Sequence, residues 1–353
     1  MVTSEQVWAA LRRVRDPELG RDLVSLGMVR EVVVDGGRVG VTVVLTTPAC
    51  PLTERIEGEI RAAVGALPGV EDVEVRLEAQ VPMHARLWAV EGLGIKNVIA
   101  VGSGKGGVGK STVAANLAVA LAGMGAVVGL MDADVYGPNL PEMLGVSRLP
   151  APRGNKILPA VAYGVRVMSL GFLLPPEQPV IWRGPMLHSA VRQFLEDVDW
   201  GLLDYLVVDM PPGTGDVAIS LAQLVPVTGA VVVTTPQGVS LSDVGRAVRM
   251  FERLGVPVLG VVENMSGFVC PHCGRETAIF GKEGGRRLAE RMGVPFLGEI
   301  PLDPRVREGE EEGRPVVVAD PEGPAGRALR AIAQQVAARI SVLNLSQEPV
   351  SNP

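Results

Sequence analysis

The sequence has few cysteines, few aromatic residues and no excess of positive charge. Three cysteines in 353 residues, an odd number, do not make a disulfide framework and favour a reduced, cytoplasmic protein. The net charge of −6 argues against nonspecific nucleic-acid binding, which requires a basic surface. No apolar run approaches the ~18 residues of a membrane span, and the amphipathic N-terminus lacks a signal-peptide pattern. We therefore expect neither nucleic acid nor membrane as a partner.

Aromatic residues make up only 4% of the chain, so the core has to consist mainly of Val, Leu, Ile and Ala. Blocks of valine suit parallel strands that are buried on both faces. The length of 353 residues predicts two domains with a large buried core.

Residues 1–80 predict a small α+β domain. A helix-patterned start is followed by two strands on either side of Asp35-Gly36-Gly37, which is a hairpin signal. A second helix is predicted near 52–67 and a closing strand over 70–77. Residues 81–96 lack clear periodicity and are interpreted as a linker.

Strand-like and helix-like segments alternate over residues 97–343. This alternation predicts an α/β domain with a doubly wound, mostly parallel sheet and a site at the carboxyl ends of its strands. The predicted strands are 98–101, 127–131, 205–209, 230–234, 258–263 and 296–299. Residues 344–353 are predicted to form a flexible tail.

A phosphate-binding loop follows the first of these strands. Residues 102–112 read GSGKGGVGKST and contain the Gly-x4-Gly-Lys-Ser pattern of nucleotide triphosphatases. The glycines let backbone N–H groups converge on phosphate oxygens, and the next helix directs the positive end of its dipole at the same anion. Lys110 would reach the β- and γ-phosphates, and the Ser111 hydroxyl would complete the Mg²⁺ shell. The predicted nucleotide-binding residues of this loop are Gly104, Lys105, Gly106, Gly107, Val108, Gly109, Lys110, Ser111 and Thr112.

Carboxylates end two of the predicted strands. Asp132 and Asp134 follow the strand 127–131, and Asp209 ends an apolar strand and opens the sequence DMPPGTGD. A carboxylate at this edge of the sheet can bind Mg²⁺ through water or orient an attacking water molecule. Adjacent loop acids can instead act as caps or solubilising charges, and Asp209 can belong to a plain strand-end turn.

Cys270 and Cys273 form a Cys-x-x-Cys pair in a glycine-bounded loop. Two thiolates at this spacing grip one metal ion or one edge of a cluster, but a four-thiolate site needs two more sulfurs and the chain offers only the distant Cys50. A second copy of the loop, related by a two-fold axis, would complete a site for a 4Fe–4S cluster. The alternatives are a bridging zinc ion, a zinc site that includes His272, and a redox dithiol.

The motifs together resemble a known family. KGGVGKS, with two lysines five residues apart, resembles the deviant phosphate loop of the MinD/ParA/nitrogenase-iron-protein class of ATPases. The succession KGGVGKS, DADVYGPN, DMPPGTGD, ENMSGF and CPHC resembles the Mrp/ApbC family of iron–sulfur cluster carrier ATPases over residues 85–340. Residues 1–80 resemble a small domain related to iron–sulfur assembly proteins, a match that rests partly on TTPACP at 46–51.

The resemblance implies catalytic roles for three residues. Lys105 would cross a homodimer interface and touch the partner's nucleotide, as an arginine finger does. Lys110 would bind phosphate, and Asp134 would position the hydrolytic water.

The resemblance also implies ligands. Asn264 would contact adenine, and Pro301 and Asp303 would belong to a loop that closes over the base. Cys50 matches a cysteine implicated in cluster handling, although a half-buried structural cysteine fits it equally well. The implied metal ligands are Ser111, Asp132 and Asp209 for Mg²⁺, and Cys270 and Cys273 for the cluster.

We therefore expect an ATP-binding and ATP-hydrolysing carrier that holds a labile 4Fe–4S cluster at a homodimer interface and transfers it to apo-proteins. Its cofactors would be ATP, Mg²⁺ and the 4Fe–4S cluster. The alternative is a MinD/ParA-like positioning ATPase that acts on membrane or DNA, which would share the nucleotide motifs but not require Cys-x-x-Cys. A nitrogenase-type reductase fits less well, because the cysteines here are paired in one loop.

Overall fold

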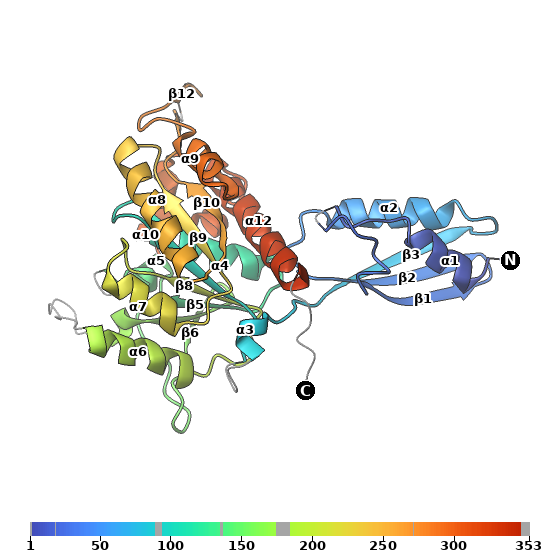
Figure 1. Cartoon of the computed structure of the whole chain (residues 1–353), viewed down its shortest axis with the longest axis horizontal. Helices are drawn as coiled ribbons and strands as arrows, with labels where there is room; N and C mark the ends of the chain where they lie inside the picture. Colours follow the sequence, from blue (N-terminus) through green and yellow to red (C-terminus); the bar gives the residue numbers. More distant parts are fainter. Residues whose placement is uncertain are drawn as a thin grey trace. The chain divides into compact units, whose positions relative to one another are not determined.

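The structure is a computed structural model that describes residues 2–17, 19–88, 94–134, 137–173, 184–270 and 272–346. Its described residues divide into two compact units (Figure 1). One unit contains residues 2–82 and 337–346, and the other contains residues 83–336.

The N-terminal unit is an α+β fold, as predicted. Its elements are α1 (Ser4–Leu11), β1 (Val29–Asp35), β2 (Arg38–Leu45), α2 (Thr53–Gly65) and β3 (Asp72–Ala79). The sheet order is β1-β2-β3, with β1 antiparallel and β3 parallel to β2. Every second residue of β2 is buried, because one face of this sheet packs against the core that it shares with the two helices.

The larger unit is built on an eight-stranded sheet with the order β13-β10-β9-β4-β8-β5-β7-β6. All its pairings are parallel except that of β6 with β7. The strands are β4 (Val98–Ser103), β5 (Val128–Asp132), β6 (Ala160–Ala162), β7 (Val165–Ser169), β8 (Tyr205–Asp209), β9 (Gly229–Thr234), β10 (Val258–Glu263) and β13 (Phe296–Glu299). The central strands β4, β5, β8 and β9 are buried throughout, which explains their unbroken apolar sequences. The predicted mostly parallel α/β sheet is confirmed.

Helices and a small hairpin complete this unit. The α-helices are α3 (Ala85–Trp88), α4 (Lys110–Gly123), α5 (Leu140–Met143), α6 (Gly184–Glu196), α7 (Asp216–Leu224), α8 (Gly238–Arg253), α9 (Gly284–Met292), α10 (Pro304–Glu311), α11 (Val316–Ala319) and α12 (Pro324–Ser346), of which α12 belongs to this unit only up to residue 336. A 3₁₀ helix, η1, covers Leu170–Phe172, and β11 (Phe268–Val269) pairs with β12 (Glu276–Thr277). No helix in the described ranges combines the length and the apolar character that crossing a bilayer requires.

Two boundaries differ from the sequence-based expectations. Residues 344–346, expected in a flexible tail, are helical, and Asn344 Nδ2 donates to the Pro82 carbonyl over 3.1 Å. Part of the expected linker 81–96 is ordered on the larger unit, because Leu87 is buried in its core and the Lys96 amide donates to Leu203. Residues 89–93 of that range lie outside the described residues.

Candidate nucleotide site and cysteine loop

The phosphate loop, residues 102–112, connects β4 to α4, and its glycines meet specific steric demands. Gly107 and Gly109 have φ values of 77° and 79°, a region that side chains with a Cβ rarely adopt. A Cβ on Gly104 would lie 2.3 Å from the Asp243 backbone, so this glycine lets the loop rest directly on α8. The glycine spacing therefore reflects both backbone conformation and close packing.

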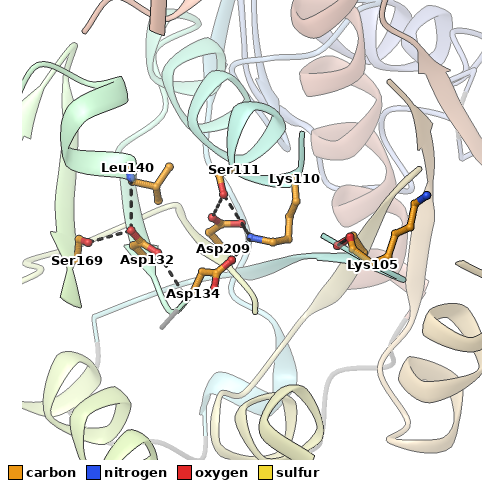
Figure 2. A network of polar contacts seen from close by, with 9 residues as sticks. Lys105, Lys110, Ser111, Asp132, Asp134, Leu140, Ser169 and Asp209 are labelled. Atoms are coloured by element: carbon orange, nitrogen blue, oxygen red, sulfur yellow. Dashed lines mark hydrogen bonds and ion pairs between the residues drawn. The ribbon is translucent and has the colours of Figure 1, made fainter. Parts of the chain in front are cut away.

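Figure 2 shows a buried ionic cluster where α4 begins and β5 and β8 end. Lys110 Nζ lies 2.6 Å from Asp209 Oδ1 and 3.2 Å from Asp134 Oδ2. The Ser111 hydroxyl donates to Asp209 Oδ2 over 2.6 Å. β5 and β8 are neighbours in register, and this brings acids that are far apart in the sequence onto one lysine. The structure thus brings together four of the predicted site residues.

The opposite charges of this cluster favour the ionised form of one another. Burial is the largest single influence on Lys110 and would lower its pKa, but the carboxylates of Asp209 and Asp134 together raise it above the usual value. Burial raises the pKa of Asp209, and the contacts with Lys110 and Ser111 act against that rise. Lys110 therefore remains cationic and available to an anionic ligand.

Asp132 is fully buried and holds the segment that follows β5. Its carboxyl accepts hydrogen bonds from the Ser169 hydroxyl over 2.8 Å, from the Asp134 amide over 3.1 Å and from the Leu140 amide over 3.4 Å. Burial, followed by the charge of Asp209, raises the pKa of Asp132 to about 8. These contacts organise the loop that carries Asp134, and a role of Asp132 in the metal shell stays a prediction.

The phosphate loop opens into a cavity of about 490 Å³. Its other walls include Asn139 and Glu142 beside α5, and Arg307 and Glu310 on α10, none of which was predicted from the sequence. Among the described residues, Glu310 Oε1 is buried without a hydrogen-bond partner, and burial raises the pKa of this carboxyl. The acidic run that contains Glu310 was the available signal, but nothing in the sequence indicates that it turns toward the phosphate loop.

The residues expected near the base are divided between two places. Asn264 Nδ2 donates to the Val108 carbonyl over 3.0 Å, so Asn264 contacts the phosphate loop directly. Pro301 and Asp303 line a different cavity of about 320 Å³, and Asp303 caps α10 by accepting from the Arg305 amide over 3.0 Å. Helix α10 borders both cavities. The assignment of these residues to the base remains a prediction.

Lys105 does not join the ionic cluster. Its side chain extends away from Lys110, Asp134 and Asp209 (Figure 2), and no carboxylate among the described residues pairs with it. The contact of Lys105 with a partner's nucleotide stays a prediction.

Cys270 and Cys273 lie in the turn of the β11–β12 hairpin. The turn closes through the Cys270 amide, which donates to the Arg275 carbonyl over 3.0 Å, and the Gly274 amide, which donates to the Cys270 carbonyl over 2.9 Å. Cys270 is half-buried and Cys273 is exposed. The backbone amide of His272, followed by the amide and the thiol of Cys273, lowers the pKa of Cys270.

The hairpin supplies a pair of thiols but no complete metal site. Within the described parts of the chain, no three His, Cys, Asp or Glu side chains gather closely enough to hold a metal ion. The choice between an iron–sulfur cluster and a zinc ion at this hairpin stays a prediction. The third cysteine, Cys50, belongs to the N-terminal unit, where it is half-buried.

Comparisons with known proteins assign relatives to both parts of the chain. Residues 94–337 match the family described as NUBPL iron-transfer P-loop NTPase, and residues 4–77 match the family of iron–sulfur cluster assembly proteins. The iron–sulfur cluster carrier protein of Synechocystis is 52% identical over 352 residues, which cover 98% of this chain and 100% of the relative. The protein of the same name from Deinococcus radiodurans is 54% identical and covers 98% of this chain and 97% of the relative.

Solved structures resemble the larger unit. A nucleotide-binding protein in complex with ADP from Archaeoglobus fulgidus is 40% identical, with a TM-score of 0.59 over 68% of this chain and 92% of that one. The cell division ATPase MinD of Pyrococcus furiosus is 27% identical, with a TM-score of 0.52 over 68% of this chain and 98% of that one. The similarity to MinD is a relationship of fold, and the positioning alternative has no further support.

Proposed function

Because the chain belongs to the NUBPL iron-transfer P-loop NTPase family, we propose that it is an iron–sulfur cluster carrier that binds and hydrolyses ATP. The observation that carries the proposal is the pairing of a phosphate loop with a two-thiol hairpin that has no third ligand nearby in the described chain. A carrier needs a site that binds its cargo and also releases it, and an incomplete, accessible site suits that task.

The nucleotide would occupy the cavity at the phosphate loop. Lys110 would bind the β- and γ-phosphates, since its ammonium already serves two carboxylates that anionic oxygens can replace. Mg²⁺ would be held by Ser111 and Asp209, whose oxygens lie 2.6 Å apart, and would offset the phosphate charge. Asp134 would orient the attacking water, and Lys105 of a second copy would complete the charge around the γ-phosphate.

The cluster is the cargo of the protein. Cys270 and Cys273 from two copies would supply four thiolates to one 4Fe–4S cluster on a two-fold axis. The lowered pKa of Cys270 supports this role, since iron is bound by the thiolate. Apo-proteins that require a cluster would receive it by thiol exchange. Because the nucleotide and the cluster would share the dimer interface, each should change the affinity for the other.

Anaerobic reconstitution with iron and sulfide tests the proposal. The wild-type chain should acquire the visible absorption of a 4Fe–4S cluster, bind four iron atoms per dimer on that model, and pass the cluster to an apo-ferredoxin. Cys270→Ala and Cys273→Ala should lose both properties, whereas Cys50→Ala should still load the cluster, because its thiol lies outside the hairpin. A Cys270→Ala protein that still loads and transfers a cluster would refute the proposal, and metal analysis that finds zinc in place of iron would do the same.

A further inference from the structure

The carboxylate of Glu263 joins the two ends of the cysteine-bearing segment. Glu263 is the last residue of β10 and is fully buried. Its Oε1 accepts from the Ser266 hydroxyl over 2.6 Å and from the Glu283 amide over 3.0 Å, and its Oε2 accepts from the Gly285 amide. Ser266 precedes the cysteine hairpin and Glu283 follows it. The side chain of Glu263 therefore holds together the two ends of the segment that carries the cysteines.

The surroundings of Glu263 are built for this contact. The carboxylate faces the N-terminus of α9, where free amides and the helix dipole favour a negative charge. A Cβ on Gly285 would lie only 3.1 Å from Glu263 Cβ, so a glycine permits the close approach. Glu283 is held at a φ of 62°, which a non-glycine residue adopts only when its neighbours enforce it. A buried carboxylate with these partners is costly to remove, since three donors would lose their acceptor.

The next residue connects the same strand end to the phosphate loop. Asn264 Nδ2 donates to the Val108 carbonyl over 3.0 Å. A Cβ on Gly109 would lie 2.1 Å from that nitrogen, so the loop and Asn264 touch at a point where only glycine fits. Met265 then reverses the chain at a φ of 58°, with its amide donating to Asn264 Oδ1 over 2.9 Å. The phosphate loop and the base of the cysteine segment thus meet at two consecutive residues.

We propose that Glu263 is a positioning residue that, through Asn264, links nucleotide occupancy of the phosphate loop to the placement of Cys270 and Cys273 within one chain. The inference rests on the proposed function and deepens it, because it adds a route for coupling that needs no second subunit. A ligand that moves the Val108 carbonyl displaces Asn264. The three hydrogen bonds that Glu263 accepts from Ser266, Glu283 and Gly285, here called the clamp, carry that displacement to both ends of the hairpin.

Thiol reactivity tests the link without iron. In a Cys50→Ser/Cys273→Ser background, Cys270 is the only thiol, and its rate of modification by a small maleimide reports its surroundings. Saturating Mg-ADP, which lacks the γ-phosphate that Lys105 of a second copy would contact, should slow this reaction by about fivefold, the lower end of typical coupling between sites. In Glu263→Ala the ratio of rates with and without nucleotide should fall to about one. Ser266→Ala, which removes one contact of the three, should give an intermediate ratio and guards against a Glu263 variant that fails to fold.

Two controls make the outcome decisive. Val261→Ala alters a fully buried residue of the same strand that lies outside the clamp, and it should keep the wild-type ratio. Binding of a fluorescent ADP is measured on every variant, so that a lost response is scored only where nucleotide is bound. The inference is overturned if Glu263→Ala keeps the full ratio, if Val261→Ala loses it equally, or if the parent chain does not respond. Failure of iron loading with an intact ratio would reject the carrier function and leave the link standing.

Discussion

Lys110 and Asp209 form a buried ion pair at the carboxyl edge of the sheet, with 2.6 Å between Nζ and Oδ1. Only 6% of the lysine side chain and 0% of the aspartate side chain are exposed. The lysine opens α4 and the aspartate ends β8, so the pair joins the phosphate loop to the neighbouring strand. In the proposed role, phosphate oxygens would require the same ammonium, and nucleotide binding would then exchange one set of contacts for another.

Replacement of Lys110 should affect activity and stability separately. Lys110→Met removes the charge that the phosphates need, so ATP hydrolysis should fall to background. It also leaves Asp209 buried without its cation, which costs about 3 kcal/mol of unfolding free energy. Lys110→Met/Asp209→Asn should recover much of that stability and stay inactive. Phosphate release and urea unfolding provide the measurements, and stability losses that simply add in the double variant would contradict the pairing.

Asp132 should leave a signature in the pH dependence of stability. Burial raises its pKa from 3.8 to about 8, so between these values the native chain keeps a proton that the unfolded chain has released. The resulting stabilisation is complete below pH 3.8, declines as the pH rises and is gone above about 8. Asp132→Asn should lack this decline. The measurement is the free energy of unfolding by urea, determined for both proteins in EDTA as a function of pH. Wild-type and Asp132→Asn curves that run parallel over this pH range would contradict the raised pKa of Asp132.

Two glycines at opposite ends of α4 form a matched pair for substitution. Gly109→Ala places a Cβ 2.1 Å from Asn264 Nδ2 at a φ of 79°, so the loop or Asn264 has to move and nucleotide affinity should fall at least tenfold, about 1.4 kcal/mol. At Gly123, the last residue of α4, a Cβ meets nothing within 4 Å, so Gly123→Ala should bind nucleotide as the wild type does. Titration with a fluorescent ADP compares them, and equal affinities would show that the Asn264 contact has no bearing on the loop.

Lys105 should act on turnover more than on binding. Because its side chain points away from the ionic cluster of its own chain, Lys105→Ala should retain ADP affinity. Loss of a charge supplied to the partner's nucleotide should reduce ATP hydrolysis by at least a hundredfold, about 2.7 kcal/mol in the barrier, and weaken dimer formation with AMPPNP. Phosphate release and sedimentation velocity measure these effects, with Lys156→Ala as a control. Unchanged hydrolysis would remove Lys105 from the catalytic set.

The features that could be predicted from the sequence are those encoded in contiguous residues. The phosphate loop is contiguous, and its glycines, Lys110 and Ser111 can be recognised without a fold because the chemistry requires that spacing. The six predicted strands are also present, since buried parallel strands leave unbroken apolar segments. Strand β6 was missed because a three-residue strand with exposed Val161 shows no usable period. Strand β7 was missed although its short sequence is largely apolar and buried.

Contacts that depend on tertiary structure could not be predicted. Ser169 reaches Asp132 only because β7 pairs with β5, and the register of that pair has no signature in the sequence. Glu310 borders the nucleotide cavity because α10 turns back over the phosphate loop. The clamp at Glu263 likewise joins residues on either side of a hairpin, and a charged residue at the end of an apolar strand gives no hint of its partners.

If the two hairpin cysteines hold the cluster as proposed, their unequal exposure would give its transfer a direction. A thiol approaching from solvent meets Cys273 before it meets the half-buried Cys270. Ligand replacement would therefore begin at the sulfur of Cys273. The sulfur of Cys270 would stay bound to the cluster until the acceptor protein has bound part of it. In this order of steps the iron–sulfur cluster is bound by at least one of the two proteins throughout its transfer. An oxygen-sensitive cluster would therefore never be released into water.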